Sequence, residues 1–155
     1  MPAFVKGPNY RQPFGRNEFL RSTQDIKTES YTVSAASVPE VEIDGHTQKV
    51  LQTGTVMARI TSGAEEGKVG PFDALATDGR QTAANIVGLN NTFLPWQLME
   101  RDVEIAVVYE ATAVQAWCFE YVSDGEVEPS SVLEALSDAT ADEMRGKKRL
   151  DIMFA

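Results

Sequence analysis

Hydrophobic and polar residues alternate in short runs through the middle of this 155-residue chain, between residues 51 and 122. Glycine, proline or the pair Asp78-Gly79 separates the runs at intervals of about ten residues, a spacing typical of a small β-sandwich or barrel. The runs richest in β-branched residues stand at 53–61, 83–89 and 103–109. The pattern therefore predicts a mainly β protein with a small sandwich-like or barrel-like body at residues 28–124.

The same alternation predicts individual strands. Tyr31 and Val33 alternate with serine and threonine, which indicates a half-buried strand. Residues 40–43 alternate between acidic and aliphatic side chains and lead into the turn signal Asp44-Gly45. The run at 105–109 is apolar on both faces, so we expect it to be the most buried strand.

The last segment, residues 125–155, predicts one α-helix. Ser131 and Glu134 have the spacing of a capping box, in which a hydroxyl and a carboxylate bond to the amide groups at a helix start. Gly146 then ends the helix. Alternating apolar residues at 150–154 predict a final short strand or a docked tail.

The first segment, residues 1–27, predicts an extended N-terminal arm because prolines interrupt any regular pattern. It carries five basic and two acidic residues, a net +3, on a chain whose net charge is −9. A solvated tail without a partner is one interpretation of this charge. Aromatic residues are unusual in such a tail, and they favour a segment that orders against another surface. The aromatic residues of the arm are Phe4, Tyr10, Phe14 and Phe19.

Composition argues against several classes of function. After residue 27 the chain holds nine basic and 21 acidic residues, which argues against nucleic-acid binding because phosphate contacts need a positive surface. No apolar run approaches the roughly 18 residues that span a bilayer, and no signal peptide is recognisable. We therefore expect a soluble product with no membrane partner.

A single cysteine excludes an internal disulfide and a multi-cysteine metal site.

Few residues of the sequence are candidates for catalysis or metal binding. Cys118 and His46, the only cysteine and histidine, would allow a Cys–His nucleophile pair. However, Cys118 lies between two aromatic residues in a strand-like run at 114–122, where cysteine behaves as a small hydrophobe. We expect His46 to be exposed after its turn, and Asp44 beside it does not complete a metal site. The sequence thus predicts no enzyme, no metal and no cofactor. Two carboxylate pairs, Asp102 with Glu104 and Glu65 with Glu66, are expected to be solvated.

The connection at residues 90–99 is unusually apolar. A core-filling loop is one interpretation, since aromatic residues dominate cores and interfaces alike. The other is a contact between subunits. The residues that would form this contact are Phe93, Leu94, Pro95 and Trp96.

The central stretch resembles the head decoration (cement) proteins of tailed bacteriophages, of the kind typified by the lambda head decoration protein. The resemblance covers residues 53–108. Its features are Gly54-Thr55-Val56 at the start of a strand, Gly67-Lys68 followed by Pro71 and Asp73, Asp78-Gly79, and residues 84–89 with their internal glycine. In that family a β-rich body forms a homotrimer on three-fold and quasi-three-fold positions of the capsid. A flexible N-terminal segment orders there by pairing with strands of the major capsid protein.

The resemblance implies a structural protein on the capsid exterior of the virion, with the major capsid protein and its own copies as partners. Strand addition gives affinity through the backbone, and the arm together with the strand at residues 31–33 would serve it. The alternative is a small β-barrel binding module of another virion structure such as the tail. The residues assigned to the capsid contact are Phe4, Tyr10, Arg11, Phe14, Arg16, Phe19, Arg21, Tyr31 and Val33.

Overall fold

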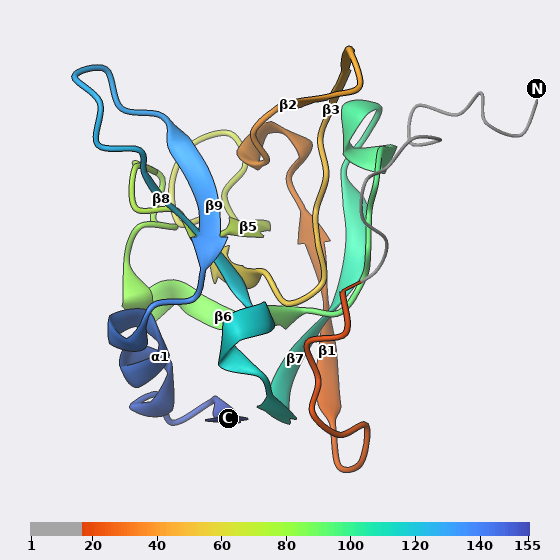
Figure 1. The fold of residues 1–155 in the computed structure, drawn as a ribbon, viewed down its shortest axis with the longest axis vertical. Coiled ribbons are helices and arrows are strands. Elements are labelled where there is room, and N and C mark those ends of the chain that lie inside the picture. Colours follow the sequence, from red (N-terminus) through yellow and green to blue (C-terminus); the bar gives the residue numbers. More distant parts are fainter. Residues whose placement is uncertain (1–16) are drawn as a thin grey trace, which may run out of the picture.

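A computed structural model describes residues 17–155 (Figure 1). The described chain is mainly β with one α-helix near its C-terminus, which confirms the predicted fold class. The strands are β1 (Lys27–Val33), β2 (Val41–Ile43), β3 (His46–Gln48), β4 (Val56–Arg59), β5 (Val69–Pro71), β6 (Ile86–Asn90), β7 (Val103–Ala113), β8 (Phe119–Ser123), β9 (Ser131–Ala135) and β10 (Asp151–Phe154). The helices are α1 (Asp138–Arg145) and the short 3-10 helices η2 (Ala35–Ser37), η3 (Ala83–Asn85), η4 (Gln97–Met99) and η5 (Gln115–Trp117).

Five of the strands close into a small barrel. The main sheet has the order β1-β5-β4-β6-β7-β10, and β1 also pairs with β7. The ring closes where β1 and β5 meet in parallel at a single pair, Val33 opposite Val69. The backbone amide of Ser34 donates to the Val69 carbonyl oxygen at 2.9 Å and reinforces this junction. Closure leaves the short barrel strands few free edges.

Two hydrophobic clusters lie on the two faces of the barrel strands. Met57 belongs to one cluster, with Val33 and Ile105, whereas its neighbours Val56 and Ala58 belong to the other. Successive residues of a strand point to opposite faces, so strand β4 is buried on both sides. The run predicted to be most buried lies in β7, the longest described strand, which pairs with β1, β6 and β10.

Residues 17–20, which the sequence assigned to the arm, pack on the barrel. Phe19 is only 1% exposed and belongs to a core cluster, and its carbonyl oxygen accepts from the Val114 amide at 2.8 Å. Leu20 forms an isolated bridge with Ala113. Burying Phe19 thus fixes residues 17–20 to the body, although the sequence assigned them to the arm. Residues 1–16 lie outside the described residues.

The C-terminal helix starts later than predicted. Residues 131–135 form β9, which pairs antiparallel with all five residues of β8, so the predicted capping box at Ser131 does not exist. Helix α1 instead begins at Asp138 behind the N-cap Ser137, whose Oγ accepts from the Thr140 amide at 3.2 Å. Gly146 ends the helix and β10 provides the final strand, as predicted.

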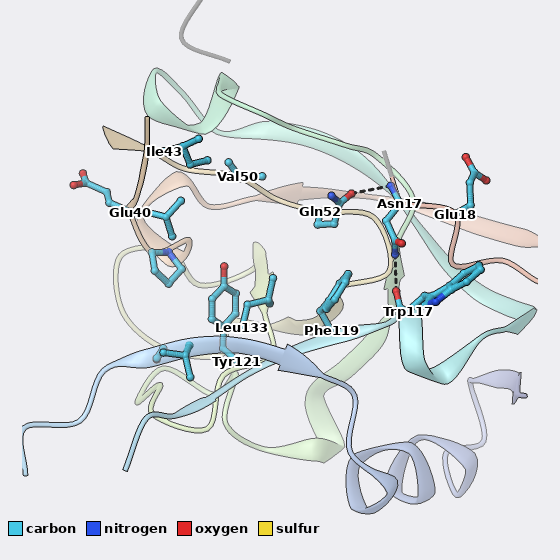
Figure 2. Close-up of a pocket in the computed structure, with 14 residues that line it drawn as sticks. Asn17, Glu18, Glu40, Ile43, Val50, Gln52, Trp117, Phe119, Tyr121 and Leu133 are labelled. Carbon is cyan, nitrogen blue, oxygen red and sulfur yellow. Dashed lines mark hydrogen bonds between the residues drawn. The ribbon is translucent and has the colours of Figure 1, made fainter. Parts of the chain in front are cut away.

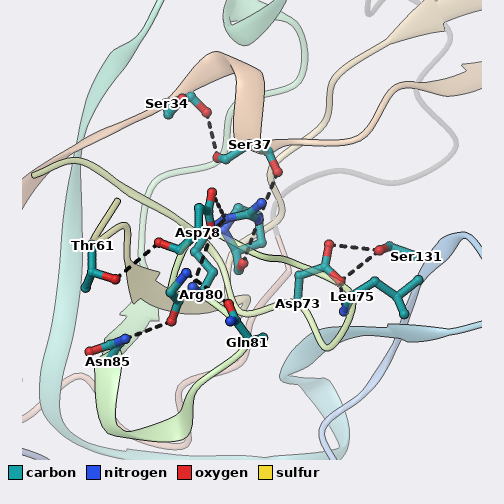
Figure 3. A network of polar contacts seen from close by, with 12 residues as sticks. Ser34, Ser37, Thr61, Asp73, Leu75, Asp78, Arg80, Gln81, Asn85 and Ser131 are labelled. Atoms are coloured by element: carbon teal, nitrogen blue, oxygen red, sulfur yellow. Dashed lines mark hydrogen bonds and ion pairs between the residues drawn. The ribbon is translucent and has the colours of Figure 1, made fainter. Parts of the chain in front are cut away.

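A buried arginine fixes the loop after β5 (Figure 3). Arg80 Nε donates to the two carboxylate oxygens of Asp78 at 3.0 and 3.1 Å. Its Nη1 donates to the carbonyl oxygens of Ser37 and Pro71 at 3.2 and 3.1 Å. Ser131 Oγ lies 2.8 Å from both carboxylate oxygens of Asp73 in the same loop, which ties β9 to the barrel. The loop thereby sets the position of the β8–β9 hairpin.

Candidate functional site

An apolar groove of about 890 Å³ lies between the β2–β3 hairpin and the β8–β9 hairpin (Figure 2). Val41, Ile43 and Val50 line its first wall, and Phe119 and Leu133 line the second. Neither hairpin belongs to the barrel sheet. The two ribbons thus leave apolar side chains facing a space that the barrel does not fill.

The groove exposes apolar surface to water. Among the described residues, six large hydrophobic side chains are notably exposed, and three of them, Val41, Trp117 and Leu133, line this groove. Trp117 is the most exposed of the three, at 51%. Contiguous apolar surface of this kind marks an interaction site, whereas singly scattered residues do not. The groove is therefore the candidate functional site.

The N-terminal side of the described chain anchors at one end of the groove. The backbone amide of Asn17 donates to Gln52 Oε1 at 3.0 Å, and its Nδ2 donates to the Trp117 carbonyl oxygen at 2.5 Å. Asn17 and Glu18 themselves line the groove. The first described residues therefore lie at the groove wall.

The groove has an uncharged floor and an acidic rim. Burial, followed by the nearby Asp73 carboxylate, raises the pKa of Tyr121 to about 12, so its phenol stays neutral at physiological pH. Glu18 and Glu40 are exposed at the rim and are the only charged residues in the described lining. An occupant that fits this surface has apolar side chains and positive rather than negative charge.

Helix η5 leaves Trp117 exposed and is followed directly by the buried Cys118. The sequence predicted one strand over residues 114–122, but η5 interrupts it at Gln115–Trp117 and β8 starts only at Phe119. Trp117 consequently faces solvent at the groove, whereas Cys118 is fully buried. A parallel bridge from Phe119 to Thr55 holds the start of β8 against the barrel.

The structure places the residues of the predicted capsid contact in different environments. Phe19 and Val33 are buried in the two core clusters, so their side chains do not offer a surface to a partner. Strand β1 pairs with β7 along its whole length, with Tyr31 opposite Ile105, and the edge facing β7 is therefore already occupied. Arg21 is exposed and Tyr31 is half-buried. The remaining predicted residues, Phe4, Tyr10, Arg11, Phe14 and Arg16, lie outside the described residues.

Two of the four residues of the predicted subunit contact are buried, and the other two are half-buried. Leu94 is buried and exchanges backbone hydrogen bonds of 2.9 and 3.0 Å with Leu51, and Pro95 is also buried. For these two residues the core-filling interpretation is correct. Phe93 and Trp96 are half-buried and keep part of their surface available for a contact.

Cys118 and His46, the catalytic candidates, lie in different environments. Cys118 is fully buried, and burial raises the pKa of its thiol to about 12. His46 is exposed on β3, as predicted. Within residues 17–155, no three side chains among histidine, cysteine, aspartate and glutamate gather to hold a metal ion.

Comparison of the chain with protein-family models, curated proteins and solved structures found no match. None of the described helices is long and apolar enough to cross a membrane.

Proposed function

We propose that this chain is a structural decoration (cement) protein that binds the outside of a phage head as trimers and stabilises the shell. Its partners are the major capsid protein and its own copies, and it works by binding alone. The resemblance of residues 53–108 to head decoration proteins supports the shell as the target. The single observation that carries the proposal is the exposed apolar groove that begins where the N-terminal segment joins the body.

The groove and the N-terminal segment would form one continuous contact surface. Asn17 anchors the chain at the groove wall, so a segment that engages a capsid subunit brings that subunit next to the groove. Lys6, Arg11 and Arg16 before position 17 are basic, whereas Glu18 and Glu40 at the rim are acidic. A capsid subunit that contacts both parts therefore presents acidic residues to the segment and basic residues to the rim. The groove then receives apolar side chains from the same capsid subunit.

The binding energy available in the groove suits a docking surface. Burying a large apolar side chain completely is worth about 1.5–3 kcal/mol, and Trp117, Val41 and Leu133 are all incompletely buried. Part of this gain offsets the cost of ordering the contact. A tryptophan at the edge of a pocket is also the residue type that dominates measured interface energies.

Stabilisation of the shell follows from mass action. A protein that binds the assembled shell and not its separated subunits shifts the equilibrium away from disassembly. A trimer multiplies this effect because its second and third attachments become intramolecular. Phe93 and Trp96, half-buried in the connection between β6 and β7, are the side chains we assign to the trimer contact.

Co-sedimentation distinguishes the head from the tail as the target. We expect the purified protein to pellet with heads that lack it and to stay in the supernatant with isolated tails. Leu133→Glu, which places a charge in the groove wall, should reduce the pelleted fraction. Met153→Glu makes the same change at an exposed apolar residue outside the groove and should behave as wild type. Pelleting with tails alone would favour the alternative of a tail-associated module.

A further inference from the structure

A second concave site lies where the segment after α1 meets the barrel. This cleft has a volume of about 680 Å³ and is lined by β1, β4, β7 and residues 147–150. Four of its side chains are positively charged, and we call them together the basic cleft. The basic cleft consists of Arg59, Lys147, Lys148 and Arg149.

The basic cleft departs from the charge of the rest of the molecule. Residues 17–155 hold 11 basic and 23 acidic residues, yet four of those basic residues line this one site. Glu29 is the only acidic residue in its described lining. Elsewhere, most cations of the described chain already pair with carboxylates: Lys27, Lys68, Arg80, Arg101 and Arg145 each form an ion pair.

The cations of the basic cleft have few anionic partners of their own. Lys147 Nζ donates to the Ala84 carbonyl oxygen at 2.6 Å, and the Arg59 guanidinium lies 5.9 Å from the centre of the Tyr31 ring. Lys148 and Arg149 are exposed, and within the described residues neither forms an ion pair. The positive charges of Arg59 and Arg149 oppose the rise in the Tyr31 pKa that burial and Glu29 cause.

The chain itself carries a surface of complementary chemistry. The turn between β8 and β9 presents Glu126, Val127 and Glu128, which we call the acidic tip, and Val127 is 99% exposed. Asp124 accepts from the amide groups of Glu126 and Ser130 at 3.0 and 3.2 Å, so the turn is held in shape. Within the described residues, neither glutamate of the tip forms an ion pair.

The acidic tip does not reach the basic cleft of its own chain. Figure 1 shows the end of the β8–β9 hairpin at the opposite end of the molecule from the segment that follows α1. A contact between the two surfaces therefore needs a second copy. Such a head-to-tail contact uses two different patches on each subunit, and it closes into a ring when the rotation between neighbours allows.

We propose that the basic cleft binds the acidic tip of a second copy of this chain. The inference rests on the trimer of the proposed function and adds a charged contact to the one assigned to Phe93 and Trp96. Glu126 and Glu128 face Lys148, Arg149 and Arg59 in this contact, and Val127 enters the cleft between them. Because the contact depends on exposed charges, it weakens as salt concentration rises.

Charge exchange tests the contact. We would compare the wild type with a cleft variant (Lys148→Glu and Arg149→Glu), a tip variant (Glu126→Lys and Glu128→Lys) and a variant that combines all four changes. The control, Lys27→Glu with Arg101→Glu, changes the net charge as the cleft variant does at exposed positions outside both surfaces. Sedimentation equilibrium at low and high salt gives the strength of self-association for each.

We expect the cleft and tip variants each to weaken self-association by about tenfold or more, and the combined variant to restore it. The control should associate as the wild type does. A wild type that stays a single subunit at every concentration, or a combined variant that is not restored, would overturn the proposal. The proposal would also be overturned if only the cleft variant lost self-association, the tip variant associated as the wild type does, and the wild type bound inorganic phosphate. That result would assign the cleft to a small anion.

The failure of this inference and the failure of the proposed function are distinguishable. If the chain is not a decoration protein, no form of it binds heads, and the sedimentation measurement is unaffected. If only the inference is wrong, heads still bind the wild type while the charge variants associate in solution as the wild type does.

Discussion

Phe19 lies directly against Gly54. A Cβ atom at position 54 would lie 3.0 Å from the Phe19 Cβ atom and 2.8 Å from the Trp117 carbonyl oxygen. Gly54 also has a φ of +88°, a conformation that L side chains rarely adopt. The absence of a side chain at this position lets residues 17–20 cross the barrel and brings the N-terminal segment to the groove.

Gly54→Ala should therefore destabilise the protein by about 2–5 kcal/mol, because it adds steric overlap to the cost of a positive φ. Gly63→Ala is the matched control: its φ is +89°, but nothing lies within 4 Å of the added Cβ. The control should lose about 1 kcal/mol. Urea unfolding of both variants measures the difference, and equal losses would show that residues 17–20 do not pack on Gly54.

Phe19→Ala should lower the free energy of unfolding by about 3–5 kcal/mol, as expected for a buried aromatic residue. Val127→Ala should leave that free energy near the wild-type value, because the Val127 side chain is 99% exposed. Denaturant titration of the two variants provides the comparison. A Phe19→Ala protein as stable as the Val127→Ala one would contradict the burial of Phe19.

Cys118 should be inert to thiol reagents in the folded protein. Burial raises its pKa to about 12, so almost no thiolate exists at neutral pH. Labelling should become rapid only in denaturant, and Cys118→Ser should bind heads as the wild type does. Rapid labelling of the native protein would show that the thiol is accessible and would reopen the question of its reactivity.

Asp102 should make stability depend on acid pH. The sequence placed this carboxylate on solvated surface, but it accepts from the Ala35 amide at 2.8 Å and pairs with Lys68 at 2.5 Å. The Ala35 hydrogen bond, and then Lys68, hold the pKa of Asp102 below its usual value.

The stabilisation by ionised Asp102 is complete above its unfolded-state pKa of about 3.9, and it is lost as the pH falls through the lower folded-state pKa. Asp102→Asn should thus be less stable than wild type at neutral pH, and the difference should disappear in acid. Thermal unfolding across this range measures it, with the exposed neighbour variant Glu104→Gln as control. A difference that grows as the pH falls would contradict the assignment.

The sequence predicted local features that depend on adjacent residues. The Asp44-Gly45 turn does join β2 to β3, and Gly146 does end the helix. The capping box at Ser131 failed because residues 131–135 suit either a helix or a strand, and pairing with β8 decides between them. The paired residues are 8 to 16 positions apart, beyond the reach of helix-start signals.

The groove was not predictable for a related reason. Val41 and Leu133 are 92 positions apart, and only the closure of the barrel places their hairpins side by side. A sequence pattern reports that each is apolar, not that both remain exposed. Phe19 illustrates the reverse case: its proline-containing surroundings suggested an extended arm, but packing against Gly54 buries it.

The central claim, that this protein cements a phage shell, is tested most directly by the temperature at which undecorated heads come apart. We predict that adding the protein raises this temperature until the binding sites are saturated, and that Met153→Glu does the same. Leu133→Glu should give a smaller rise at equal concentration. An unchanged disassembly temperature at saturating wild-type protein, measured by light scattering, would contradict the account.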